Sequence, residues 1–158
     1  MYAPIPLQNA AVELVGRDTA ILPEARGLFN RARLLANLKR AKAAITRQPH
    51  RLLVLADIQV QAVNRSYIGL KTVALDDIRG TQDKADSFDA EFRPVREDMM
   101  TRWAGVAGAV LRGVPLPPVE LVEVDGTYYV TDGHHRISVA RAMGQTAIEA
   151  VVTRWKSA

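Results

Sequence analysis

The stretch YYVTDGHHRISVARAMG, residues 128–144, carries the pattern that decides the fold. Its first residues form an apolar run of strand-forming types, and a helical pattern begins directly afterwards and stops at Gly144. The junction between the two is occupied by five residues: Asp132, Gly133, His134, His135 and Arg136. We therefore predict a strand that leads straight into a helix, with a dense group of polar side chains at the corner.

This corner has the residue types of an anion site. The first turn of a helix leaves backbone N–H groups without intrahelical acceptors and carries the positive end of the helix dipole. Gly133 has no Cβ to obstruct a ligand, Arg136 offers a forked donor for phosphate or carboxylate, and the two histidines can donate to phosphate or exchange a proton. We expect nucleotide phosphates to be held by Gly133, His134, His135 and Arg136.

Asp132 has three open interpretations at this position. It is a plain helix cap, a carboxylate that orients a histidine, or a ligand of a metal bound to phosphates. If the corner is catalytic, His134 and Asp132 are the candidate catalytic residues. Adjacent histidines point about 100° apart around a helix, so His134 and His135 alone do not predict a metal site.

The segments around the corner predict a small sheet. PVELVEV and TYYVT flank Asp125-Gly126, a pair typical of a tight hairpin in which both turn residues need positive φ. YIGLKTVAL (67–75) and TAIEAVVTRW (146–155) are typical of further strands, whereas RLLVLADI (51–58) is either a strand or a helix end. A hairpin mixed with helices predicts the α+β class.

Two longer helices are expected. The first opens at Pro23 and closes before Pro49, and its apolar side is expected to face the core through Leu28, Ala32, Leu35, Leu38 and Ile45. The second runs from Asp98 to Arg112 and ends at Gly113.

The first of these helices is also basic. Residues 1–71 hold 11 Lys/Arg and 4 Asp/Glu, whereas residues 72–158 hold 10 and 13, so the basic pI of 9.7 belongs to the N-terminal half. Arg33, Arg40 and Arg47 recur every seven residues on the side predicted to lie opposite the core. This column is the candidate face for nucleic acid or an acidic partner, and an ordinary solvated helix face is the alternative.

Residues 79–97 are polar and acidic, and they have no helical or strand period. A loop of this length inside a compact domain is often functional. Phe88, Phe92 and Pro94 are expected to anchor it, and Arg93 and Arg96 are expected to close over bound phosphates.

Composition excludes several classes of protein. The chain has no cysteine, which rules out disulfides, thiolate zinc sites and cysteine redox chemistry, and fits a cytoplasmic location. No apolar run approaches the roughly 20 residues of a membrane span, and the N-terminus does not have the pattern of a signal peptide. The phosphate-binding patterns G-x-x-x-x-G-K-[ST] and G-x-G-x-x-G are both absent from the sequence.

Residues 68–154 resemble the ParB/sulfiredoxin superfamily. KTVALDDIRG resembles its opening strand and turn, and a long loop, a helix ending in LRGVPLPPVEL, the hairpin and VTDGHHRISVARAMG follow in the family's order. The resemblance implies a small α+β fold that holds a nucleotide phosphate where the second hairpin strand meets the helix. It divides the chain into a basic helical extension, 1–66, and a ParB/sulfiredoxin-like domain, 67–158.

The branches of this superfamily differ at the corner. Sulfiredoxins need a cysteine where this chain has His134, so their chemistry is excluded. Chromosome-partition ParB proteins, which bind CTP, carry Gly-Glu-Arg-Arg here; Gly133 and Arg136 match, but no helix-turn-helix module follows, so partition-site recognition is not expected. ADP-dependent free-serine kinases carry Asp-Gly-His-x-Arg, which Asp132, Gly133, His134 and Arg136 match. Such a kinase also needs an upstream acid, for which the candidates are Asp76, Asp77, Asp83, Asp86, Asp89 and Glu91.

Three functions follow as hypotheses. The first is a nucleotide-binding ParB-like module with a regulatory or partner-binding role, with CTP, ATP or ADP and Mg²⁺ as the implied ligands. The alternative is a small Mg²⁺-dependent phosphotransferase, and the third is nucleic-acid binding through the basic helix. The implied partners are a nucleotide or phosphorylated small molecule and an acidic protein or nucleic acid, without a membrane; a homodimer is left open.

Overall fold

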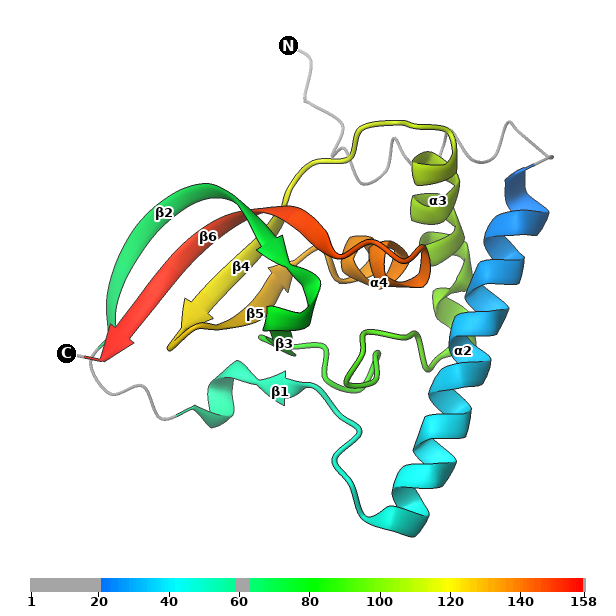
Figure 1. Cartoon of the computed structure of the whole chain (residues 1–158), viewed down its shortest axis with the longest axis horizontal. Helices are drawn as coiled ribbons and strands as arrows, with labels where there is room; N and C mark the ends of the chain where they lie inside the picture. The colour runs from blue at the N-terminus through cyan, green and yellow to red at the C-terminus, as the bar shows by residue number, and fades with distance from the viewer. Residues whose placement is uncertain (1–20, 59–62, 158) are drawn as a thin grey trace.

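The computed structural model describes residues 21–58 and 63–157, and these residues form an α+β fold (Figure 1). The α+β class predicted from the sequence is confirmed. The helices are α2 (Ile21–Thr46), α3 (Met100–Leu111) and α4 (His134–Ala142), with short 3-10 turns η1 (Leu55–Asp57), η2 (Leu75–Asp77) and η3 (Glu97–Met99). The strands are β1 (Leu53–Val54), β2 (Val63–Ala74), β3 (Ile78–Thr81), β4 (Val119–Val124), β5 (Thr127–Asp132) and β6 (Ala147–Ser157).

The six strands form one mixed sheet in the order β1-β3-β5-β4-β6-β2. β3 pairs parallel with β5, and β4 pairs parallel with β6, whereas β4–β5 and β2–β6 are antiparallel. Because β3 and β5 run in the same direction, their carboxyl ends, Thr81 and Asp132, lie at the same edge of the sheet. The helix α4 starts at that edge, so the sheet brings the loop after β3 to the predicted corner.

The predicted hairpin is confirmed. Asp125 and Gly126 have φ values of 49° and 80°, the two positive values that a two-residue hairpin turn requires. The undecided run 51–58 contains the short strand β1 and the turn η1.

Helix α4 is buried on two sides. Ile137 and Ala140 pack into the cluster that contains the sheet residues Val119 and Val130, and Val139 packs into a second cluster with α2 and α3. On the α3 side, the Trp103 indole N–H donates to the Ser138 hydroxyl at 2.8 Å. α4 therefore lies between the sheet and the other helices, as Figure 1 shows.

The predicted core side of α2 is wrong in part. Its buried residues are Ala25, Phe29, Ala32, Ala36 and Ala43. Leu35, Leu38 and Ile45, which were expected to face the core, are 41%, 58% and 84% exposed. The reason is the surface of α3 against which α2 packs. α3 presents Trp103 with Ala104 and Ala107, and small residues on both helices allow the two helices to approach closely.

The predicted position of the arginine column on α2 is also wrong. Arg33 and Arg40 follow the buried Phe29 and Ala36 by four residues, so they lie at the margin of the buried face and not opposite it. Arg33 pairs with Glu97 at 3.4 Å, and Arg47 follows the end of the helix with a φ of 55°.

The loop between β3 and η3 is anchored as expected. Phe88, Phe92 and Pro94 are all buried, and the two aromatic rings lie 6.3 Å apart. Asp89 organises the loop because its Oδ1 accepts the backbone N–H groups of Glu91 at 2.9 Å and Arg93 at 2.8 Å. The loop therefore has a fixed path past the start of α4.

Two further features concern the predicted domain boundary and the character of the helices. The division between residues 66 and 67 that the resemblance implied falls inside β2. Among the helices that the structure describes, none combines the length and the apolar character that crossing a membrane requires.

Candidate functional site

The corner between β5 and α4 begins with a left-handed residue. Gly133 is the N-cap of α4, with φ 101° and ψ 21°, and its carbonyl oxygen accepts the N–H of Ile137 at 3.0 Å. The N-cap residue is therefore Gly133 and not Asp132. The backbone N–H groups of the first turn, from His134 to Arg136, therefore have no acceptor within the helix.

Gly133 is required by packing as well as by its backbone angles. A Cβ at this position would lie 2.5 Å from Val119 Cγ1 and 2.8 Å from Val119 Cβ. The side of Gly133 that was expected to admit a ligand is therefore filled by β4 and by the nearby Arg136 guanidinium carbon, which a Cβ would approach to 3.3 Å.

His134 is only 2% exposed and is committed to the loop after β3. Its Nε2 lies 2.7 Å from Thr81 Oγ1, and its ring stacks on Phe88 with centroids 5.9 Å apart. Thr81 Oγ1 already accepts the N–H groups of Asp83 (3.3 Å) and Lys84 (3.1 Å), so its own hydrogen is donated to His134 Nε2. His134 is therefore the neutral tautomer with its proton on Nδ1.

Burial keeps His134 neutral. Desolvation, followed by the charge of Lys84, lowers the pKa of His134 to about 4, while Asp83 and Asp132 act in the opposite direction. A buried, neutral histidine with Nε2 hydrogen-bonded to Thr81 positions the loop. Only its Nδ1–H can then donate a hydrogen bond to another group.

His135 differs from its neighbour because neither ring nitrogen has a hydrogen-bond partner among the described residues. Its ring meets Phe88 edge-on at 5.5 Å, and its Nδ1 is fully buried. An unpaired N–H is costlier to bury than an unpaired lone pair, so the proton belongs on Nε2. His135 therefore presents an N–H donor from the first turn of α4.

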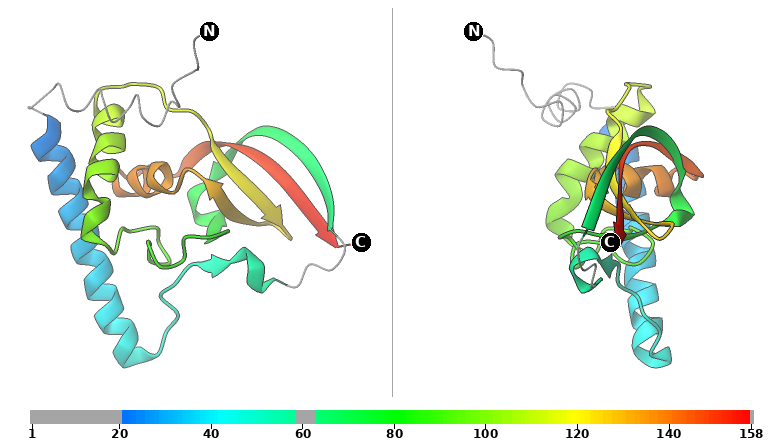
Figure 2. Two further views of the ribbon diagram at one scale, coloured as in Figure 1. Left: turned by 180° about the vertical axis from the view of Figure 1, so that it is seen from behind. Right: turned by 90° about the vertical axis from the view of Figure 1, so that its left-hand side faces the viewer.

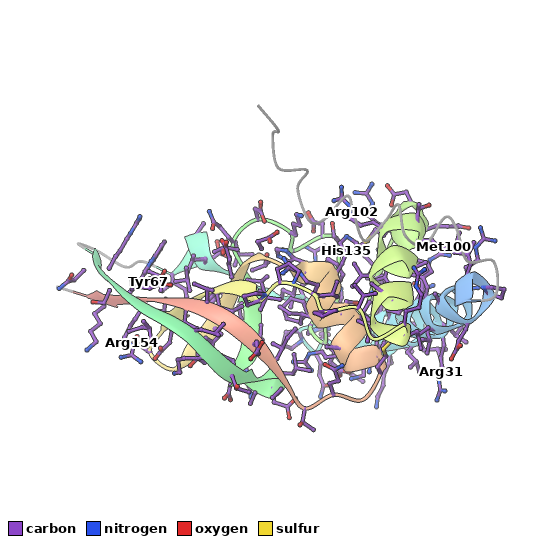
Figure 3. The ribbon with its side chains drawn as sticks, turned by 90° about the horizontal axis from the view of Figure 1, so that it is seen from above. Arg31, Tyr67, Met100, Arg102, His135 and Arg154 are labelled. Carbon is purple, nitrogen blue, oxygen red and sulfur yellow. The ribbon has the colours of Figure 1, made fainter. Side chains whose placement is uncertain are left out.

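The charges around His135 are cationic. Desolvation, and then Arg102, Lys84 and His134, lower the pKa of His135 to about 4. Arg102 reaches this place from α3 and Lys84 from the loop after β3, and both are exposed. Figure 3 shows Arg102 and His135 on the same side of the molecule, on α3 and α4.

Arg136 is engaged by the protein itself. One terminal nitrogen donates to the carbonyl oxygens of Pro117 (2.6 Å) and Pro118 (2.8 Å), and the other donates to Asp132 at 2.6 Å. Its side chain is 10% exposed. The guanidinium thus links the segment before β4 to the start of α4. Arg136 was predicted to donate hydrogen bonds to phosphate, but it already donates to three oxygen atoms of the protein.

Arg93 and Arg96 form ion pairs away from the first turn of α4. Arg93 pairs with Asp89 at 3.4 Å and with Glu91, and it lines a cavity at the carboxyl end of α4. Arg96 is exposed and donates from Nε to Asp98 at 3.0 Å.

The candidate upstream acids are also spread over the molecule. Asp83 lies close enough to His134 to act on its pKa. Asp76 faces Arg141 at 3.6 Å and Asp86 faces Arg51 at 3.9 Å, while Glu91 pairs with Lys39; Asp77 is exposed and Asp89 is buried in the loop. Across residues 21–58 and 63–157, no three His, Cys, Asp or Glu side chains are grouped so that they could hold a metal ion.

Sequence reasoning missed Thr81, Lys84 and Arg102. A threonine at a strand end, a lysine in an acidic loop and an arginine in the first turn of a helix are each ordinary alone. Only the parallel pairing of β3 with β5 and the packing of α3 beside α4 bring them to His134 and His135. Together they form the corner cluster, which we define as Thr81, Lys84, Arg102, His134 and His135.

Comparison with known proteins adds little to this geometry. No protein-family model matches the sequence, and no curated protein matches it. Sulfiredoxin from Arabidopsis thaliana is similar in structure, with 22% sequence identity over 52% of this chain and 82% of the sulfiredoxin chain, and a TM-score of 0.38. The candidate site therefore depends on its own geometry.

Proposed function

We propose that the corner cluster binds the phosphate group of a nucleotide, and that the chain is a nucleotide-binding module. The observation that carries this proposal is His135, a neutral histidine without a hydrogen-bond partner among the described residues, at the first turn of α4. Because its buried Nδ1 is left as a lone pair, His135 keeps its proton on Nε2, and that N–H can donate to an anion attracted by the neighbouring cations.

Three kinds of donor support an anion at this place. The first-turn N–H groups of α4 and the helix dipole favour negative charge. Arg102 and Lys84 supply full positive charges. Both side chains are exposed, so they can reorient toward a bound anion. The His135 Nε2–H adds a short-range donor close enough to both cations for their charges to lower the pKa of His135. Their combination matches the several oxygens of a phosphate better than a single carboxylate.

The neutral state of His135 also suits a reversible site. Burial, and then cationic neighbours, lower the pKa of His135 in the free protein, and a bound phosphate opposes them by favouring the protonated form. Binding would then strengthen the hydrogen bond from His135 to the anion.

Calorimetric titration with inorganic phosphate, CTP, ATP and ADP, with and without Mg²⁺, tests the proposal. We expect Arg102→Ala to weaken binding by about 1.5–3 kcal/mol, the scale of a hydrogen bond to a charged group, which is roughly 10- to 150-fold in Kd. Lys84→Ala should weaken it in the same direction. The matched control is Lys156→Ala, an exposed cation near the far end of β6 (Figure 1).

Two outcomes would contradict the proposal. One is the absence of binding by all four ligands, and the other is an equal loss in the Lys156→Ala control, which would mean that the ligand responds to overall charge. Arg136→Ala is a poor test, because losing its contacts with Pro117 and Pro118 would disturb the corner itself.

A further inference from the structure

The outer face of α2 carries an apolar stripe. Leu34, Leu38 and Ile45 are 59%, 58% and 84% exposed, and their spacing of four and seven residues places them on one side of the helix. This side points away from the buried alanines, and the carboxyl half of α2 extends past the amino end of α3 (Figure 2). Large apolar side chains grouped in this way on an exposed helix are typical of an interaction surface.

The stripe is bordered by positive charge. Arg31 lies three residues before Leu34, and Lys42 lies four residues after Leu38, so both are at its margin. α2 has six basic residues, Arg26, Arg31, Arg33, Lys39, Arg40 and Lys42, and its one acid is Glu24 in the first turn. A second copy of the same face would bring like charges together, whereas a partner with acidic margins would be attracted.

A cavity of about 410 Å³ opens beside the stripe, between α2 and the carboxyl end of α4. Leu28 and Leu35 form part of its apolar wall, and Arg31, Arg93 and Arg141 are among its polar lining. Arg141 Nε is buried without a partner among the described residues. The cavity therefore offers space for an apolar side chain next to Arg141 Nε, and its lining also holds the acids Asp76 and Glu91, which pair with Arg141 and Arg93.

We propose that this face of α2 binds an acidic amphipathic helix of a partner protein. The apolar side of the partner helix packs on Leu34, Leu38 and Ile45, and its acidic margin meets Arg31 and Lys42. One of its larger apolar side chains enters the cavity between Leu28 and Leu35. This is the helix-in-groove mode of recognition, with apolar anchors that supply affinity and charges that supply specificity.

The test uses a fluorescein-labelled synthetic amphipathic helix with leucine on one face and glutamate at both margins, and a second peptide with lysine in place of each glutamate. We expect fluorescence anisotropy to show saturable binding of the glutamate peptide and a loss of roughly tenfold or more with Leu34→Ser/Leu38→Ser. Arg31→Glu should weaken the glutamate peptide about three- to tenfold and strengthen the lysine peptide. Arg26→Glu makes the same charge change on a different side of α2 and should have a smaller effect.

Four outcomes would overturn the proposal. They are no saturable binding of the glutamate peptide, unchanged affinity in the double serine variant, equal effects of Arg31→Glu and Arg26→Glu, and occupation of the stripe by something else. Two further measurements detect another occupant of the stripe. Binding to phosphatidylserine/phosphatidylcholine vesicles that the serine variant abolishes would assign the face to a membrane. A dimer in sedimentation that the same variant dissociates would assign it to a second copy of the chain.

Discussion

Gly133 is the residue on which the geometry of the corner depends. Its φ of 101° and the 2.5 Å that would separate a Cβ from Val119 Cγ1 act together. We expect Gly133→Ala to lower the free energy of unfolding by about 2–4 kcal/mol, because left-handed strain and overpacking add. Gly144→Ala is the matched control: its φ is 75°, but no atom lies near its Cβ, so only the strain of about 1 kcal/mol remains. Equal losses in urea denaturation would contradict the packing argument.

His134 and His135 should make stability depend on pH. Their pKa of about 4 in the folded protein is below the value of about 6.5 expected in the unfolded chain, so the unfolded state binds more protons between these values. Stability is complete above about pH 6.5 and falls toward pH 4, by about 1.4 kcal/mol per pH unit for each histidine that stays neutral. His134→Gln should reduce this slope in urea denaturation at several pH values. A variant with the slope of the wild type would show that His134 is not held neutral.

At this scale, sequence reasoning located the strand-to-helix corner but not the contacts that its side chains make. A forked donor such as Arg136 fits phosphate and backbone carbonyls equally well, and only the approach of Pro117 and Pro118 decides between them. Lys84 and Arg102 could not be singled out, because residues distant in the sequence meet His135 only through tertiary packing.

Among the elements, α2 and α3 depend on small residues where they meet. Ala107 is fully buried in the cluster that contains Phe29, Trp103 and Val139. We expect Ala107→Leu to lower the free energy of unfolding by about 1–3 kcal/mol through overpacking. Ala44→Leu on the exposed side of α2 should change it by less than about 0.5 kcal/mol. Similar values for both variants, measured by urea denaturation, would contradict close packing of these helices.

The elements differ in how far sequence determines them. The hairpin at Asp125-Gly126 was predicted correctly because the need for two positive φ values is local. The buried side of α2 was not, because leucine periodicity marks any apolar face, including one that stays exposed. Which face is buried depends on α3, whose alanines select the alanine side of α2.

In the whole molecule, the candidate site is assembled from three separate parts of the chain. The end of β3 and its loop supply Thr81 and Lys84, α3 supplies Arg102, and α4 supplies the histidines. The sheet order, with β3 and β5 parallel neighbours, makes this meeting possible. The proposed partner surface on α2 lies outside this assembly, so the two proposals can be tested separately.

The most direct test is the NMR signal of the imidazole nitrogens of His135 during titration with inorganic phosphate at neutral pH. The proposal predicts a saturable change at His135, a smaller one at His134, whose Nε2 is bonded to Thr81, and a weaker response in Arg102→Ala. His135 signals that stay constant while phosphate binds, or that change no more than those of His134, would show that the phosphate lies elsewhere and would contradict the proposed function.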